Sequence, residues 1–173
     1  SRSVYENPWI RVREDEVTTP TGSEGIYGVV EFKNRAVGVV PISDNGDTWL
    51  VGQYRYALDS YEWEIPEGGC PPDEAPIDTA ARELREETGL SAGNIELLLA
   101  DLQLSNSVSD ERAWLYVATD LAPGELDPDD TEQLAVRRLP LADAVAMAER
   151  GEIRDAMSVI ALLLLKDRDF PLQ

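Results

Sequence analysis

The chain has 173 residues, enough for one domain with its own core, and its 34 acidic and 15 basic residues give a net charge of −19. It contains no histidine and one cysteine, which excludes histidine-dependent hydrolases, internal disulfides and metal sites made of histidine or several thiolates. The negative charge disfavours nucleic-acid binding, and any metal ion would need oxygen ligands, as Mg²⁺, Mn²⁺ and Ca²⁺ do.

No apolar segment approaches the roughly 20 residues that a membrane-spanning helix needs, and the longest, residues 156–165, predicts a buried helix. The first residues lack the apolar core of a signal peptide. We therefore expect a cytoplasmic protein that binds no membrane and forms one domain over residues 1–173.

Strand patterns dominate the first half of the chain. Apolar and basic residues alternate from Ile10 to Arg13. Further β-rich segments follow at residues 26–32, 36–42, 48–55 and 61–65. Between the second and third of these, Asp44-Asn45-Gly46-Asp47 predicts a hairpin turn.

A loop is predicted over residues 67–73, followed by a helix over residues 75–88. Pro76 suits the first turn of this helix and Gly89 its C-terminal cap. Its apolar stripe, which we expect to face the core, consists of Ile77, Ala80, Ala81 and Leu84.

The second half alternates strands and helices less regularly. Strands are predicted at residues 95–104, 112–119 and 134–139, and helices at residues 141–150 and 155–166. Between them, the acidic residues Asp127, Asp129, Asp130 and Glu132 predict a solvated loop. Many strands with few helices indicate an α+β fold, with helices packed on a mostly antiparallel or mixed β-sheet.

Three carboxylates of the helix over residues 75–88 share one face. Glu83, Glu86 and Glu87 lie roughly 120° around the helix from the apolar stripe. Such neighbours repel one another by about a few tenths of a kcal/mol per pair, and a cation between them reverses the sign. They are candidate Mg²⁺ ligands; the alternative is a solvated acidic face.

The segment from Gly68 to Leu90 resembles the Nudix box, G-x5-E-x7-R-E-U-x-E-E-x-G-U with U aliphatic, at every specified position. The resemblance implies an α/β/α sandwich and an enzyme that hydrolyses a nucleoside diphosphate linked to another group. It implies that Mg²⁺, with Mn²⁺ as a possible substitute, is held by Glu83, Glu86, Glu87 and the carbonyl of Glu67. It implies structural roles for Gly68, Glu74, Arg82 and Gly89.

Segments outside the box resemble one branch of this family, the ADP-ribose and nucleoside diphosphate sugar pyrophosphatases. They are residues 53–56, 63–69, 109–111 and, at the entry to the C-terminal helix, 151–155. The resemblance implies that Tyr54, Arg55 and Glu64 bind substrate. It also implies that Glu111, with Asp110 as the next candidate, acts as general base or additional metal ligand, beside the catalytic Glu83 and Glu86.

Each of these residues also has a plainer interpretation. Arg55 at a strand end suits a solvated charge, and Glu111 before a strand suits an ordinary edge residue. Tyr61 and Trp63 alternate with glutamates and suit core aromatics rather than side chains that stack on a base.

The predicted function is Mg²⁺-dependent hydrolysis of a nucleoside diphosphate sugar to a nucleoside monophosphate and a sugar phosphate. Residues 105–108, Ser-Asn-Ser-Val, depart from the proline-containing pattern of many ADP-ribose pyrophosphatases, so GDP-mannose stands beside ADP-ribose as a candidate. The branch also implies a homodimer, with N-terminal strands within residues 4–32 at the interface. The alternatives are another nucleoside diphosphate derivative, such as a dinucleoside polyphosphate or a coenzyme, and a non-catalytic nucleotide-binding module.

Overall fold

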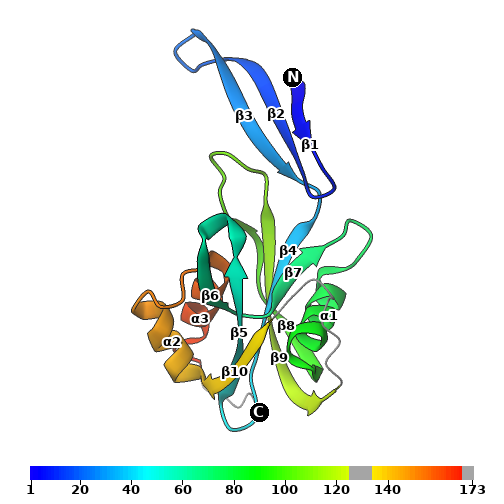
Figure 1. The fold of residues 1–173 in the computed structure, drawn as a ribbon, viewed down its shortest axis with the longest axis vertical. Coiled ribbons are helices and arrows are strands. Elements are labelled where there is room, and N and C mark those ends of the chain that lie inside the picture. Colours follow the sequence, from blue (N-terminus) through cyan, green and yellow to red (C-terminus); the bar gives the residue numbers. More distant parts are fainter. Residues whose placement is uncertain (125–133, 169–173) are drawn as a thin grey trace.

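The computed structural model describes residues 1–124 and 134–168, and in these residues the chain forms three β-sheets and three α-helices (Figure 1). The predicted acidic loop with Asp127, Asp129, Asp130 and Glu132 lies outside the described residues.

Two sheets form the body of the molecule. The larger is mixed, in the order β7 (Glu67–Cys70), β4 (Arg35–Pro41), β9 (Arg112–Pro123) and β8 (Leu90–Gln103), with β4 and β9 parallel and the other pairs antiparallel. The smaller is antiparallel, in the order β10 (Ala135–Pro140), β5 (Asp47–Arg55) and β6 (Ser60–Glu64). A short 3-10 helix, η1 (Tyr56–Leu58), joins β5 to β6.

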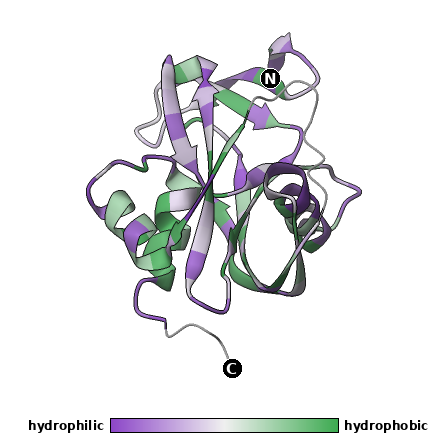
Figure 2. Ribbon diagram, turned by 60° about the horizontal axis from the view of Figure 1, so that its bottom comes forward, coloured by the Kyte–Doolittle hydropathy of each residue, from purple (hydrophilic) through white to green (hydrophobic). Residues whose placement is uncertain are grey.

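Helices cover the sheets from two sides. Helix α1 (Pro76–Thr88) packs on β4, β7 and β8, whereas α2 (Leu141–Glu149) and α3 (Ala156–Leu165) pack on each other and on the opposite side of the body (Figure 1). The larger core cluster joins α2 and α3 to both sheets, and a smaller one lies beneath α1 around Val37, Val39 and Leu84. Hydrophobic residues accordingly gather where helices and strands of the body face one another (Figure 2). The predicted α+β class and α/β/α sandwich are confirmed.

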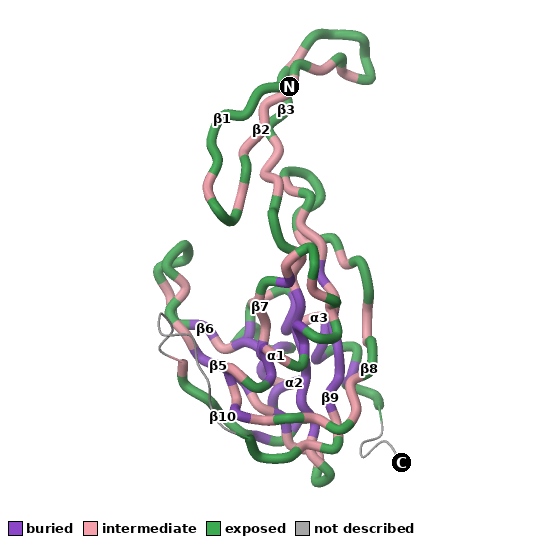
Figure 3. Tube along the Cα trace, turned by 90° about the vertical axis from the view of Figure 1, so that its right-hand side faces the viewer, coloured by how far each residue is buried: buried purple, intermediate pink, exposed green. Residues whose placement is uncertain are grey.

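An N-terminal antiparallel sheet, formed by β1 (Arg2–Glu6), β2 (Ile10–Thr18) and β3 (Glu24–Phe32), projects from this body (Figures 1 and 3). None of residues 1–32 is buried in the single chain. Hydrogen bonds join β3 to the loop before β9: the Val30 N–H donates to the Val108 carbonyl at 2.8 Å, and the Phe32 N–H donates to the Asp110 carboxylate at 2.8 Å. The loop that carries Glu111 is therefore attached to the N-terminal sheet.

Three local predictions differ from the structure. The turn at residues 44–47 forms and is closed by one antiparallel bridge between Ile42 and Thr48, but β5 then pairs with β6 and β10 rather than with β4. Residues 67–70 form strand β7 rather than a loop, because their backbone pairs with β4. In α1, Ile77 and Ala81 are exposed, whereas Glu83 and Glu87 are buried with Ala80 and Leu84.

Candidate active site

Helix α1 begins and ends as the sequence predicts. Pro76 occupies its first turn, and Gly89 caps its C-terminus with φ +69°, a conformation that glycine adopts without strain. The cap N–H of Gly89 donates to the Arg85 carbonyl. This places the glutamates of the last turns at the end of the helix next to β7.

Arg82 binds the acidic residues of the box together. Its Nη1 donates to Glu83 at 2.7 Å and to Glu86 at 2.9 Å, and its Nη2 donates to Glu74 at 3.2 Å and to the Gly69 carbonyl at 3.0 Å. One guanidinium thus contacts two carboxylates of α1 and also binds the segment that precedes this helix. These contacts support the structural roles that the resemblance implies for Arg82 and Glu74.

Gly68 is required by the close approach of Glu83. A Cβ at position 68 would lie 2.0 Å from Glu83 Oε1, well inside any real contact. The carboxylate of Glu83 therefore occupies the space that a side chain at position 68 would fill. This contact brings the backbone of β7 and the acidic face of α1 together.

Glu87 reaches the same strand from the next turn. Its side chain is buried, and its Oε2 accepts a hydrogen bond from the Glu67 N–H at 2.9 Å. A buried carboxylate is costly unless it is hydrogen-bonded or paired. Burial of Glu83 and Glu87 excludes the interpretation of this helix face as a fully solvated one.

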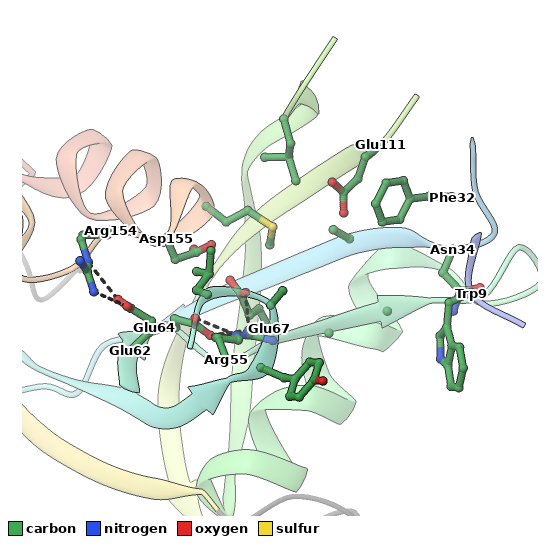
Figure 4. A pocket seen from close by; sticks show the side chains of 18 of the residues that line it. Trp9, Phe32, Asn34, Arg55, Glu62, Glu64, Glu67, Glu111, Arg154 and Asp155 are labelled. Carbon is green, nitrogen blue, oxygen red and sulfur yellow. Dashed lines mark hydrogen bonds and ion pairs between the residues drawn. The ribbon is translucent and has the colours of Figure 1, made fainter. Parts of the chain in front are cut away.

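A cavity of about 1000 Å³ opens beside β7, between β6, the start of α3 and the loop before β9 (Figure 4). This volume is at the upper end of the range for small-molecule sites. Its polar and charged lining residues are Asn34, Arg35, Arg55, Ser60, Glu62, Glu64, Glu67, Glu111, Arg154 and Asp155. Aromatic and aliphatic residues lining it include Trp9, Phe32, Tyr56, Leu58, Leu104 and Met157.

Arg55 lies at the centre of this cavity (Figure 4). Its Nε donates to both oxygens of Glu64, at 2.9 and 3.1 Å, and its Nη2 donates to Glu64 and, at 3.1 Å, to Glu67. Within the described residues its Nη1 donates to no protein group. Arg55 is thus not a freely solvated charge; it is fixed by carboxylates and keeps donors for a ligand.

The Glu67 side chain is buried at the floor of the cavity. Its Oε1 accepts from Arg55, and its Oε2 has no hydrogen-bond partner in the described residues. Burial raises the pKa of the Glu67 carboxyl well above its usual range, the charges of Asp155 and Glu64 raise it further, and Arg55 opposes them. The sequence pointed only to the carbonyl of this residue.

Glu111 and Asp110 point to different parts of the molecule. Glu111 lines the cavity, and burial, followed by the charges of Asp155 and Asp110, raises its pKa (Figure 4). The Asp110 carboxylate instead accepts the Phe32 N–H, and the Asp110 N–H donates to the Val30 carbonyl at 3.2 Å. The arrangement favours Glu111 over Asp110 as a group that meets substrate.

Tyr54 does not lie where its expected role requires. It is not among the described residues that line the cavity; its ring is exposed and its hydroxyl donates to Asp59. Arg55, the next residue of β5, lines the cavity. Successive residues of a strand face opposite sides, so the side chain at position 54 points away from the site.

Several lining residues were missed by the sequence reasoning. Glu62 is 4% exposed and is bound by Arg154, while Tyr61 on the same strand is 51% exposed, so β6 buries its acids and exposes an aromatic. Asp155 caps α3 by accepting the Ser158 N–H at 2.7 Å. The alternation of glutamates with aromatic residues was the available signal for Glu62. It was misleading because such a pattern usually buries the apolar residues and exposes the charged ones.

The donors near β7 suit a hard divalent cation. Glu83, Glu86 and Glu87 supply carboxylate oxygens, and buried Glu67 Oε2 has no partner in the described residues, which is the donor chemistry that Mg²⁺ and Mn²⁺ prefer. In the described ranges no three acidic or cysteine side chains already form a cluster that holds a metal ion, and Arg82 lies between Glu83 and Glu86. The residues therefore fit the ion by chemistry, with Arg82 balancing their charge.

None of the helices among the described residues is long and apolar enough to cross a membrane. The predicted buried helix forms as α3 but is buried on one side only, because Leu163 and Leu164 are exposed.

Comparison with known proteins gives the same family as the motif at residues 68–90. Residues 32–161 match the model of the NUDIX domain, and residues 1–30 match that of the nucleoside diphosphate sugar hydrolase N-terminal domain. An ADP-ribose pyrophosphatase of Mycobacterium tuberculosis is 34% identical over 94% of this chain and 79% of its own length. The ADP compounds hydrolase NudE of Escherichia coli is 33% identical over 95% of this chain and 88% of its own.

A solved structure, described as that of an ADP compounds hydrolase, superimposes with a TM-score of 0.84 at 29% identity, covering 95% of this chain and 89% of that one. Members of the family generally need a divalent cation. Together with the intact box on α1 and the acidic cavity beside it, these matches show that the chain belongs to the Nudix family of pyrophosphohydrolases.

Proposed function

We propose that this protein is a Mg²⁺-dependent hydrolase of nucleoside diphosphate sugars, with ADP-ribose as its first candidate substrate. The observation that carries the proposal is the cavity in which Arg55, fixed by Glu64 and Glu67, faces Glu111 beside the box helix (Figure 4). The names of the relatives favour an ADP compound over GDP-mannose. GDP-mannose remains in the test because residues 105–108 depart from the sequence pattern of many ADP-ribose pyrophosphatases.

The reaction adds water across the pyrophosphate. One P–O bond to the bridging oxygen breaks, a new P–O bond forms to the water oxygen, and the products are a nucleoside monophosphate and a sugar phosphate. Glu111 accepts the proton that the water loses, and the burial that raises its pKa makes it a stronger base than an ordinary carboxylate. The free Nη1 of Arg55 donates to a phosphate oxygen.

Glu83, Glu86, Glu87 and the Glu67 carbonyl would hold the metal. When bound, Mg²⁺, or Mn²⁺ in its place, neutralises phosphate charge and makes a bound water more acidic. In a protein with a net charge of −19, the acidic cavity alone would repel a diphosphate. Arg82 keeps two of these carboxylates side by side on α1.

The N-terminal sheet favours a homodimer; a cytoplasmic location stays part of the proposal. It exposes a set of large apolar side chains, which is unusual for the surface of a monomer. They are Val4, Tyr5, Trp9, Ile26 and Tyr27. We expect light scattering to give the mass of two chains, and Ile26→Asp to shift it toward one; a wild-type monomer would rule the dimer out.

The test is a panel of ADP-ribose, GDP-mannose, ADP-glucose and UDP-sugars, assayed with Mg²⁺ and with Mn²⁺. We expect hydrolysis of at least one sugar nucleotide to a nucleoside monophosphate. Dinucleoside polyphosphates and coenzymes are added to the same panel. If the protein cleaved only these, its substrate would be another nucleoside diphosphate derivative and not a nucleoside diphosphate sugar. Tight nucleotide binding without any cleavage would support the non-catalytic alternative, and would overturn the proposal.

A further inference from the structure

The cavity has two chemically different ends. Trp9 and Phe32 lie toward one end, Glu62 and Arg154 lie at the other, and Arg55 with Glu64 lies between them (Figure 4). A nucleoside diphosphate sugar has the same order of chemistry, with a flat base, a charged diphosphate and a hydroxyl-rich sugar. Flat bases stack on aromatic rings, and phosphates bind guanidinium groups. The end with Glu62 and Arg154 is left for the sugar.

Arg154 is held in one orientation at that end. Its Nε donates to Glu62 Oε2 at 3.2 Å, and its Nη2 donates to Glu62 Oε1. Ser60 Oγ donates to the same Oε1 at 2.6 Å, and these two partners, Ser60 first, lower the pKa of Glu62. Glu62 is therefore an ionised, 4% exposed carboxylate whose bonds fix the guanidinium plane.

Arg154 lies at the wall of the cavity and is open to solvent, with its side chain 63% exposed. Within residues 1–124 and 134–168, Nη1 donates to no protein group. An arginine that keeps two N–H groups free while the others are fixed is a preorganised donor, which loses little entropy when a ligand binds.

Charge argues against an anion at this end. Glu62 and Asp155 line this end together with Arg154, so two carboxylates lie beside one guanidinium group. Arg55, in the middle of the cavity, is already paired with Glu64 and Glu67. A further phosphate on the distal group would be repelled, whereas a neutral hydroxyl accepts a hydrogen bond from Arg154 without adding charge. The chemistry therefore fits an uncharged sugar.

We propose that Arg154 recognises the hydroxyl oxygens of the sugar beyond the diphosphate, and that Glu62 is the residue that positions it. This inference rests on the proposed function and identifies the part of the substrate that the Glu62–Arg154 pair selects. It makes Arg154 a specificity-determining residue, 92 positions away in sequence from its partner.

The test compares ADP-ribose with ADP, which lacks the distal sugar and ends in a free phosphate. Dissociation constants are measured by calorimetry in a Glu111→Gln background, to slow turnover, and KM and kcat for ADP-ribose are measured in the otherwise wild-type enzyme. Arg154→Ala should weaken ADP-ribose binding about tenfold, as loss of a charged hydrogen-bond donor does, and leave ADP binding within about twofold. KM should rise with little change in kcat.

Glu62→Gln should weaken ADP-ribose binding in the same selective way, while Arg154→Lys should keep part of the affinity. Arg150→Ala is the matched control, because Arg150 is an exposed arginine paired with Glu152 outside the cavity. Equal losses for ADP and ADP-ribose, or no loss for either, would overturn the role of Arg154. Absence of sugar-nucleotide hydrolysis by the wild-type enzyme would instead overturn the proposed function, whatever the binding constants.

Discussion

Glu87→Gln should lower kcat for sugar-nucleotide hydrolysis by about two orders of magnitude or more, with the fold intact. The substitution removes a negative metal ligand, and such ligands supply several kcal/mol of transition-state stabilisation. It keeps a side-chain oxygen that accepts the Glu67 N–H, the contact that Glu87 makes at 2.9 Å. The measurement is kcat at saturating Mg²⁺ together with the thermal unfolding midpoint.

Asp78→Asn is the matched control, since Asp78 lies on the same helix, is exposed and does not line the cavity. It should leave kcat close to that of the wild type. A Glu87→Gln variant with near-wild-type kcat would refute the metal role. A large fall in unfolding midpoint would show that its activity loss is structural.

Glu111→Gln should lower kcat by about 10²- to 10⁴-fold, the range for loss of a general base. A base works only when deprotonated, so wild-type activity should fall as the pH falls through the pKa of Glu111, which burial raises above its ordinary value. The variant should lose this acid limb. The measurement is the pH profile of kcat/KM from acid to neutral pH.

Asp110→Asn separates the two neighbouring acids. The substitution keeps a side-chain oxygen to accept the Phe32 N–H, so the activity of the variant should stay near that of the wild type. A large loss in Asp110→Asn with an unchanged rate in Glu111→Gln would transfer the base role to Asp110.

Much of the fold could be predicted because its determinants are local. Helix α1 has a proline in its first turn, a glycine at its cap and a complete box between them. Strand β7 was missed because Gly68 and Gly69 carry no alternating pattern; pairing with β4, far away in sequence, makes this segment a strand. The predicted pairing of β5 with β4 was wrong for the same reason, because β4 pairs with β7 and β9.

The site departs from the rules that predict a core. Glu62, Glu83 and Glu87 are buried, whereas Ile77 and Tyr61 are exposed, so polarity alone misplaces them. Their burial is supported by distant partners, such as the Glu67 N–H for Glu87 and Arg154 for Glu62. Sites of this kind are where sequence patterns and structure are expected to disagree.

The structure also shows what some of the acidic residues do. Among the described residues, a small set of carboxylates lines the cavity or lies on and beside α1, where they hold Arg55, Arg82 and Arg154 in place. These three ion-paired arginines put fixed donors in and beside a strongly acidic site. In the proposed mechanism, which uses no histidine, these arginines set the positions of the carboxylates.

The most direct test of the account is product analysis after incubation of the wild-type protein with ADP-ribose, once with Mg²⁺ and once with excess chelator. We predict AMP and ribose 5-phosphate in equal amounts with Mg²⁺ and neither product with chelator. Equal cleavage of ADP-ribose without metal would contradict the metal dependence. If ADP-ribose and every other sugar nucleotide stayed intact with both Mg²⁺ and Mn²⁺, hydrolysis of a nucleoside diphosphate sugar would be contradicted.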